Sequence, residues 1–311
     1  MTTNQVLPQI YKEPTHRKLY RHIIYLVPTC SNPSGKTTTL ARRKALVQLA
    51  RKYNCLVICD DVYDFLQWAL SDEWQSIPRQ VRLPRLCDID LALGPAEDDP
   101  GHFGYAISNG TFSKIVGPGV RTGWVEASPA FAYGLSQTGS TRSGGAPSQF
   151  SAALMCEMLK SGDISRQIDT LTRAALQRRH RLMLDAIQKH LGTFNVAIQE
   201  TSLLGSNIFG GYFVWFRLPE GSPTAKAIFS KASEEENLII GHGDIFEVHG
   251  DEASARFRHD IRLCFSWEPE DSLIEGVERL GRVLAGMMGG TPSNSGSPTV
   301  ETPNSSLSEF K

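Results

Sequence analysis

One lysine set among hydroxyls, glycines and an arginine is the feature of this sequence best suited to chemistry. The stretch Ser108–Trp124 reads SNGTFSKIVGPGVRTGW and places Lys114 after an apolar run. A lysine attacks an aldehyde as the neutral amine, which cationic neighbours or partial burial favour. Thr111 and Ser113 supply hydroxyls, and Arg121 supplies a planar fork suited to phosphate. A lone lysine would be read as solvated, but this cluster predicts a phosphorylated aldehyde cofactor held covalently by Lys114.

Three further polar positions follow runs that read as buried parallel strands. Asn32 comes after the apolar run Ile23–Val27, and Asp60 and Tyr63 come after the run Cys55–Cys59. Ligands of parallel sheets bind at the carboxyl ends of the strands. The acidic residues after the second run could instead cap the next helix. Their place directly after an apolar strand favours a binding role.

The elements that must position these residues start with a strand, a helix and a second strand. Between the two apolar runs, the spacing predicts a helix over Leu40–Tyr53, capped by Thr38 or Thr39, and the connection should be right-handed. Its inward positions are expected to be Leu46, Leu49, Ala50 and Tyr53. Its solvated positions are expected to be Arg42, Arg43, Lys44, Arg51 and Lys52.

Further along, the order of the expected strands and helices changes from that of an α/β domain to that of an α+β domain. Residues 71–104 read as a surface loop insertion. The expected strands are Tyr105–Asn109, Gly123–Glu126, Gly210–Phe216, Leu238–Ile240 and Ile261–Phe265, and the expected helices are Pro147–Leu159, Ile164–Leu191, Ala225–Asn237 and Ser272–Met288. The fold class predicted is α/β, with four parts: an arm over residues 1–21, a large domain over 22–160, a small α+β domain with an interdomain helix over 161–288, and a disordered tail over 289–311.

Composition narrows the function classes. The chain has 311 residues, a net charge of -1 and 41% apolar residues, so it can bury a large core in one or two domains. The balanced charge argues against nucleic-acid binding, and no apolar run is long enough for a membrane helix. The polar start predicts no signal peptide, and we expect a cytoplasmic protein. The six cysteines are dispersed and the eight histidines show no ligand spacing, so we expect no metal.

Separated motifs, occurring in one order, carry a resemblance to a known family. They are the turn Asn32-Pro33-Ser34-Gly35, the pair Asp60-x-x-Tyr63, the run Thr111–Lys114 with Pro118–Trp124, and Arg262–Ser266. From Arg21 to Met288 the chain resembles the class I/II aminotransferases of pyridoxal 5′-phosphate (PLP) fold type I. Within them it is most similar to the fungal aromatic and 2-aminoadipate aminotransferase-like group.

The resemblance implies PLP as cofactor, amino acid and 2-oxo acid as substrates, and a homodimer. It implies these roles: Lys114 for the covalent link, Asp60 for the pyridine nitrogen, Asn32 and Tyr63 for the ring hydroxyl, Thr111, Ser113 and Arg121 for the phosphate, and Arg262 for the substrate α-carboxylate. Lys114, Asp60 and Tyr63 are then the expected catalytic residues.

One departure from the family pattern concerns the N-terminal side. Members of the family carry a longer stretch before the Asn-Pro turn, with early strands, a phosphate loop and an aromatic residue that stacks on the pyridine ring. We therefore expect the chain to be N-terminally truncated and to bind PLP weakly. Two alternatives stay open: a PLP-dependent β-eliminating carbon–sulfur lyase, which uses the same lysine and arginine, and a catalytically silent remnant.

Overall fold

The chain forms two compact units, and each is described by itself. The computed structural model describes residues 17–69, 83–143, 148–199, 208–251 and 256–289. Unit 1 spans Met1–Pro28, Thr38–Val62 and Gln80–Asp163, and unit 2 spans Thr29–Thr37, Tyr63–Arg79 and Ile164–Lys311. Most of the expected N-terminal arm, residues 71–82 of the expected loop and nearly all of the expected tail lie outside the described residues.

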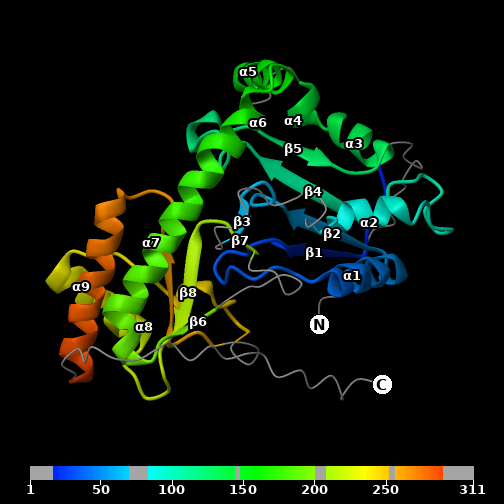
Figure 1. Ribbon diagram of the computed structural model, residues 1–311. Helices are drawn as coiled ribbons and strands as arrows, with labels where there is room; N and C mark the ends of the chain where they lie inside the picture. The colour runs from blue at the N-terminus through cyan, green and yellow to red at the C-terminus, as the bar shows by residue number, and fades with distance from the viewer. Residues whose placement is uncertain (1–16, 70–82, 144–147, 200–207, 252–255, 290–311) are drawn as a thin grey trace, which may run out of the picture. The chain divides into compact units, whose positions relative to one another are not determined.

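Unit 1 is built on a mixed four-stranded sheet in the order β1-β2-β4-β5 (Figure 1). Its strands are β1 (His22–Leu26), β2 (Cys55–Asp60), β4 (Ala106–Thr111) and β5 (Gly123–Glu126). The first three run parallel and β5 is antiparallel to β4. The predictions of strands at these four places are therefore confirmed, with small shifts of their ends.

The helices of unit 1 include the one that the sequence predicted most sharply. They are α1 (Leu40–Tyr53), α2 (Leu86–Ala92), the short 3₁₀ turn η2 (Pro118–Val120), α3 (Pro129–Ser136), α4 (Gly139–Arg142) and α5 (Gln149–Lys160). The Thr39 hydroxyl accepts a hydrogen bond from the Arg42 amide and so caps α1. Apolar residues of α1, α2, β2 and β4 form one buried cluster, which fixes these strands and hence their carboxyl ends.

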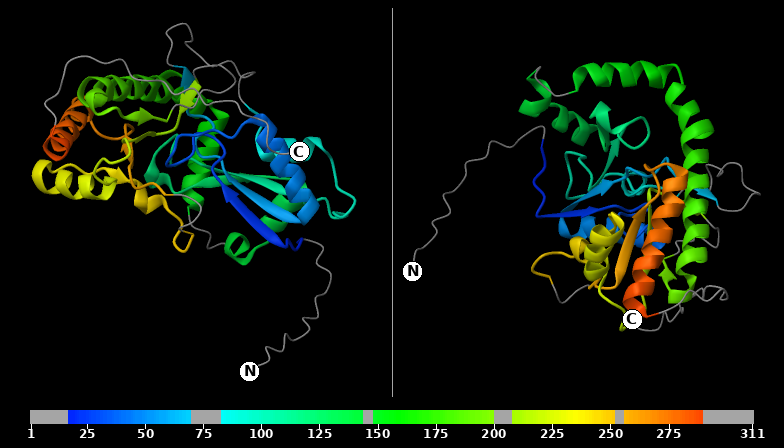
Figure 2. Two further views of the ribbon diagram at one scale, coloured as in Figure 1. Left: turned by 90° about the horizontal axis from the view of Figure 1, so that it is seen from below. Right: turned by 90° about the vertical axis from the view of Figure 1, so that its left-hand side faces the viewer.

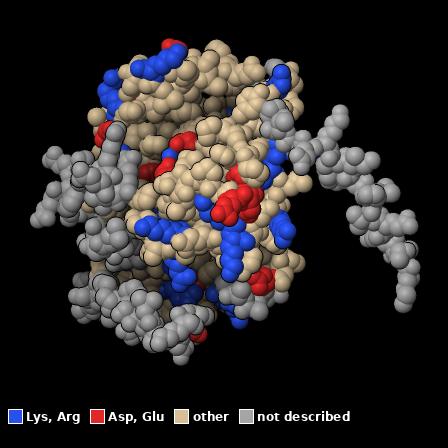
Figure 3. Space-filling model, turned by 90° about the vertical axis from the view of Figure 1, so that its right-hand side faces the viewer, with Lys and Arg blue, Asp and Glu red and all other residues tan. Residues whose placement is uncertain are grey.

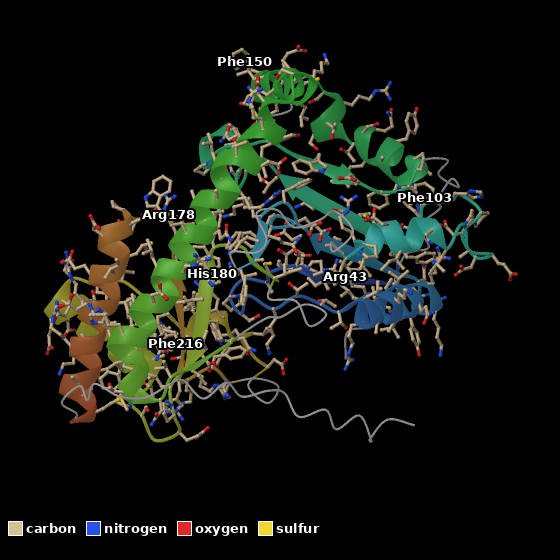
Figure 4. The ribbon with its side chains drawn as sticks, in the orientation of Figure 1. Arg43, Phe103, Phe150, Arg178, His180 and Phe216 are labelled. Atoms are coloured by element: carbon tan, nitrogen blue, oxygen red, sulfur yellow. The ribbon has the colours of Figure 1, made fainter. Side chains whose placement is uncertain are left out.

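Arg43 corrects the expectation that the basic residues of α1 are solvated. Its side chain is 1% exposed, and its guanidinium donates to the backbone oxygens of Thr38, Pro84 and Pro28 at 2.9, 3.1 and 3.1 Å (Figure 4). Conversely, Leu49 is 46% exposed. Helical spacing shows which residues share a face, whereas Arg43 is drawn inward by carbonyl groups that only the fold collects.

The expected surface insertion over residues 71–104 is wrong over residues 86–92, whereas residues 93–104 contain neither helix nor strand. Residues 86–92 form helix α2, whose Leu86 and Ile89 belong to the buried cluster of unit 1. Asp99 from the acidic stretch is 3% exposed and lies 3.4 Å from the ammonium of Lys18. The prolines that suggested a loop lie outside α2, and the short apolar pattern of this helix was too weak a signal on its own.

Unit 2 contains two small antiparallel sheets. A four-stranded sheet in the order β6-β8-β10-β9 comprises β6 (Ala197–Ile198), β8 (Phe213–Arg217), β10 (Asp260–Cys264) and β9 (Gly241–His242). A two-stranded sheet pairs β3 (Gln67–Ala69) with β7 (Ile208–Gly210).

Two strand predictions in this unit need correction. The single strand expected over Gly210–Phe216 is interrupted, because Gly211 has φ +75° and separates β7 from β8. A Cβ on Gly210 would lie 2.3 Å from the backbone oxygen of Leu66, so the chain needs glycine where it leaves the two-stranded sheet. The strand expected over Leu238–Ile240 does not form, and β9 follows it at Gly241–His242.

The helices of unit 2 pack partly on one another. A continuous helical stretch runs from α6 (Asp163–Gln167) through the π-helical turn η3 (Ile168–Thr172) to α7 (Arg173–Leu191), followed by η4 (Gly192–Phe194), α8 (Ala225–Glu236), η5 (Gly243–Phe246) and α9 (Glu270–Met288). Helices α7 and α9 lie side by side (Figure 2). On α7, His180 is buried at 6% exposure while the Arg178 side chain is 61% exposed (Figure 4).

The surface carries charges of both signs. On the face shown in Figure 3, basic and acidic side chains of the described residues lie among one another. None of the helices in the described ranges combines the length and the apolar character that a membrane crossing requires. Within those ranges, no three histidine, cysteine or carboxylate side chains gather as metal ligands would.

Candidate active site

In unit 1, the loop that carries Lys114 is anchored by buried apolar residues on both sides of it. Strand β4 ends at Thr111, and the next residue, Phe112, is 7% exposed and packs on the ring of Trp124 with centroids 4.8 Å apart. Ile115 is 5% exposed. These two anchors hold the turn between them, and Lys114 remains partly exposed.

The hydroxyls expected near a phosphate are brought together with the arginine. The Ser113 amide donates to the Thr111 hydroxyl at 3.1 Å, and the Arg121 guanidinium donates to the Ser113 hydroxyl at 3.3 Å. Arg121 has φ +47°, a left-handed conformation that is uncommon for a residue with a side chain. Hydroxyls, a backbone amide and a guanidinium in one short loop are a donor set suited to phosphate.

Asp60 lies at the end of β2, beside the same strand that leads to the lysine. In the parallel pairing of β2 with β4, Asp60 is opposite Asn109. The Asn109 side-chain amide donates to Oδ1 of Asp60 at 3.1 Å, and the Tyr25 hydroxyl donates to Oδ2 at 2.7 Å. Sequence reasoning missed Tyr25 and Asn109. Pairing the predicted strands in register would have placed both beside Asp60.

In unit 2, the Asn-Pro turn meets the arginine predicted for the substrate. The turn is closed by hydrogen bonds from the Gly35 amide to the Ser31 oxygen at 2.6 Å and from the Ser31 amide to the Lys36 oxygen at 2.9 Å. The Arg262 guanidinium then donates to Oδ1 of Asn32 at 2.7 Å, although 230 positions separate the two residues. Tyr63, also in unit 2, is 2% exposed, and its ring packs against Tyr212 with centroids 5.5 Å apart.

Two aromatic rings and a glycine confine the Arg262 side chain. The guanidinium carbon lies 4.1 Å from the ring centre of Phe213 and 4.7 Å from that of Phe246, which are cation–π distances. Arg262 pairs with Gly241 across β10 and β9. A Cβ on Gly241 would be 3.3 Å from Nε of Arg262, so the missing side chain leaves the room that the arginine occupies.

Arg262 has hydrogen-bonding capacity that the described residues leave unused. Its Nε is buried and has no hydrogen-bond partner among those residues. Burial lowers the pKa of Arg262, an effect that Cys264 and Tyr63 partly oppose. The side chain stays cationic because the pKa of arginine is far above neutral pH. A half-buried cation of this kind is suited to a carboxylate supplied by a ligand.

The predicted residues thus fall into two groups. Unit 1 carries Lys114, Asp60, Thr111, Ser113 and Arg121, and unit 2 carries Asn32, Tyr63 and Arg262. Among these residues, the structure shows the contacts Thr111–Ser113, Ser113–Arg121 and Asn32–Arg262. Together they describe an α/β protein in which the hydrogen-bond donors of the lysine loop suit an anion and the guanidinium of Arg262 suits a carboxylate.

Comparison with known proteins places the chain in a family. Residues 1–280 match the family described as aminotransferase class I and II. The chain therefore belongs to the class I and II aminotransferases, as the motifs predicted, and its α/β fold is the one found in solved aminotransferases.

Individual relatives show the same likeness. The chain is 37% identical to the uncharacterized Saccharomyces cerevisiae protein YER152C over 272 residues, which are 86% of this chain and 57% of that protein. It is 28% identical to a 2-aminoadipate transaminase of Thermus thermophilus, over 85% of this chain and 58% of the relative. The crystal structure of the α-aminoadipate aminotransferase LysN from Thermus thermophilus, complexed with N-(5′-phosphopyridoxyl)-L-leucine, matches with a TM-score of 0.67 at 27% identity, covering 86% of this chain and 59% of that one. The chain thus spans a little over half the length of these relatives.

Proposed function

We propose that this chain carries out PLP-dependent transamination, moving an amino group from an amino acid to a 2-oxo acid. The observation that carries the proposal is Arg262, a half-buried cation held by Asn32 and two aromatic rings, whose Nε has no hydrogen-bond partner among the described residues. All amino acid and 2-oxo acid substrates share one carboxylate next to the reacting carbon. Fixing that carboxylate orients the bond that must break.

The residues of the lysine loop and of β2 fit PLP in their chemistry. Arg121, Ser113 and Thr111 form the donor set that a phosphate requires, and Lys114 carries the only kind of side-chain amine that bonds an aldehyde covalently. Asp60 supplies an anion for a pyridine nitrogen, while Asn32 and Tyr63 supply groups for the ring hydroxyl. When bound, PLP supplies an electron sink for the charge left on the substrate α-carbon.

The chain's own residues then have distinct tasks in the reaction. With PLP bound, the Lys114 amine would take the proton from the substrate α-carbon and hold it for the return step of the transfer. The Asp60 carboxylate holds the proton on the pyridine nitrogen. Arg262 would bind the α-carboxylate in a bidentate manner and so fix the orientation of the substrate.

The substrate class we propose is an amino acid with an aromatic or a carboxylate-bearing side chain. Support comes from relatives named 2-aminoadipate transaminase in Thermus thermophilus and aromatic-amino-acid aminotransferase in Thermococcus litoralis, which are 28% and 29% identical to this chain. We also propose that the protein acts in the cytoplasm as a homodimer, in keeping with its family.

The direct test is product formation by the purified chain. Protein is incubated with PLP, 2-oxoglutarate and either 2-aminoadipate, tyrosine or phenylalanine, and the oxo acid and glutamate formed are quantified. Equal amounts of the two products, dependent on 2-oxoglutarate, are expected. The Lys114→Ala variant should form neither product, whereas Lys160→Ala, which changes an exposed lysine on α5, should retain both.

The result also separates this function from elimination chemistry. A β-eliminating enzyme would release ammonia from a cysteine conjugate without needing any 2-oxo acid. Ammonia release without glutamate formation would therefore replace our proposal by the lyase alternative. A chain that binds PLP and forms neither product with any of these substrates would contradict both.

A further inference from the structure

Tyr25 reaches the Asp60 carboxylate from the neighbouring strand. Strands β1 and β2 are parallel, and the last pair of their ladder is Leu26 with Cys59. Asp60 is the next residue of β2, so the side chain of Tyr25 lies on the same face of the sheet, one step back along β1. The resulting hydrogen bond, from the Tyr25 hydroxyl to Oδ2, is 2.7 Å long.

The alternation of β1 explains why this tyrosine is available. Ile24 and Leu26 face the buried cluster of unit 1. The alternate residues Ile23 and Tyr25 point to the opposite face and are 67% and 64% exposed. Packing in the described part of unit 1 therefore does not require a tyrosine here, and its hydroxyl is directed at one specific carboxylate.

Asp60 is held at both of its oxygens. Oδ2 accepts from Tyr25 and Oδ1 accepts from Asn109, whose amide comes from β4 on the other side of β2. Two donors on opposite sides prevent the carboxylate plane from rotating. Each oxygen retains a second lone pair, so the carboxylate can still accept from a ligand.

We propose that Tyr25 and Asn109 are positioning residues that orient Asp60 toward the pyridine nitrogen of PLP, and that they strengthen cofactor binding through that one atom. This inference rests on the proposed function. Neither residue acts on the substrate: each acts through Asp60. The pairing of β1, β2 and β4 brings Tyr25 and Asn109 to Asp60, so both hydrogen bonds depend on the register of the sheet.

The charge state of Tyr25 is consistent with a donor role. Burial, the hydrogen bond to Asp60 and the charge of Asp60 together raise the pKa of Tyr25 to about 12. The phenol is therefore protonated at neutral pH and can donate. Asp60→Asn should lower this pKa toward its ordinary value, because the anion that opposes ionisation is removed.

The first experiment compares two cofactors, PLP and 1-deazapyridoxal 5′-phosphate, in which a carbon replaces the pyridine nitrogen. Their dissociation constants are measured by absorbance titration with wild-type protein and with Tyr25→Phe and Asn109→Ser. The control is Tyr53→Phe, a half-exposed tyrosine at the end of α1. Each of the two test variants should weaken PLP about fivefold, the effect of one ordinary hydrogen bond, and leave the deaza compound unchanged.

Equal weakening of both compounds by Tyr25→Phe would show a merely structural role and overturn the inference. So would unchanged PLP affinity in that variant. A wild-type chain that binds neither compound overturns the proposed function and, with it, the role of Tyr25 toward the cofactor.

The second experiment needs no cofactor and tests the contact alone. In the PLP-free protein with ¹³C-labelled tyrosine, the Tyr25 resonance is assigned by its loss in Tyr25→Phe and is followed through its titration. In Asp60→Asn the pKa of Tyr25 should fall. An unchanged pKa would show that the hydroxyl does not meet Asp60 in solution, whatever the cofactor does.

Discussion

At the scale of single residues, each functional side chain of the candidate site is held in place by supporting residues. Lys114 is held by two buried anchors, Arg262 by two rings and an asparagine, and Asp60 by two donors. The sequence motifs named the first member of each set. The supporting members come from other strands and loops, and they determine where the functional groups point.

Lys114 is expected to be the residue that bonds the cofactor. Incubation with PLP followed by borohydride should attach a pyridoxyl group that peptide mapping finds on Lys114, because its loop combines an amine with the phosphate donors. Lys114→Ala should lose most of the label, and Lys160→Ala should keep it. A pyridoxyl group on a different lysine of the wild-type protein would show that the assignment is wrong.

Gly241→Ala should weaken substrate binding about tenfold, or by about 1.4 kcal/mol, with a smaller effect on kcat. The added Cβ would lie 3.3 Å from Nε of Arg262, closer than most such contacts, and would displace the guanidinium. The measurement is the KM for the amino acid. Gly276→Ala is the matched control, since its Cβ would meet only Leu238 at an ordinary 3.5 Å. Equal KM values for the two variants would rule out this role of Gly241.

At the scale of elements, a few buried polar side chains tie helices to strands. Arg43 links α1 to the residues before it and to the segment before α2 through three carbonyl groups. On α7, His180 accepts a hydrogen bond from the Trp68 indole at 3.3 Å and stacks on Phe265 at 5.0 Å. Such groups stabilise the fold only while their partners and charge states are maintained.

Arg43→Met should lower the free energy of unfolding by about 3 kcal/mol, because three carbonyl groups lose their donor in a buried place. Denaturant unfolding followed by circular dichroism measures the change. Arg42→Met alters the exposed neighbouring residue on the same helix and should change stability by less than about 0.5 kcal/mol. Similar losses in the two variants would mean that the carbonyl contacts do not matter.

His180 should make stability depend on pH. Burial lowers its pKa from 6.5 to about 4, so between these values the unfolded chain binds a proton that the folded chain does not. The free energy of unfolding should therefore fall as pH drops through this window, by about 3 kcal/mol in total. Urea unfolding at pH 7 and pH 4.5 measures it.

The free energy of unfolding of His180→Gln should depend less on pH in that window, although this variant should be less stable than the wild type at pH 7. His22→Gln, at an exposed position of β1, serves as the control and should retain the wild-type dependence. If His180→Gln also retained the wild-type pH dependence, other titratable groups would have to cause that dependence.

At the scale of the whole molecule, binding of the proposed cofactor should be measurable as a gain in stability. A ligand that binds the folded chain and not the unfolded one stabilises it by mass action. Added PLP at a hundred times its dissociation constant should therefore raise stability by about 2.7 kcal/mol. The thermal unfolding midpoint, measured with and without PLP, reports this gain.

Pyridoxal without the phosphate is the matched ligand control. It retains the aldehyde for Lys114 but offers nothing to Arg121 and Ser113, so at the same concentration it should raise the midpoint much less. An equal rise with both compounds would show that these residues do not hold the phosphate.

The sequence by itself determined the local elements and the order of the functional motifs. The bounds of α1 were predicted residue for residue, and β1, β2 and β5 nearly so, because periodicity and capping are properties of neighbouring residues. The same information named Lys114 and Arg262 and led to the correct family. These predictions required no knowledge of which strand pairs with which.

Only the tertiary structure decided which distant groups meet. Helical spacing placed Arg43 on the solvated side, yet it is buried against the carbonyl groups of Thr38, Pro84 and Pro28. Strand patterning could not show that Gly211 ends β7, that Gly241 leaves room for Arg262, or that Tyr25 meets Asp60. Such contacts depend on strand order, register and close backbone approach, which join residues far apart in the chain and therefore leave no period in the sequence.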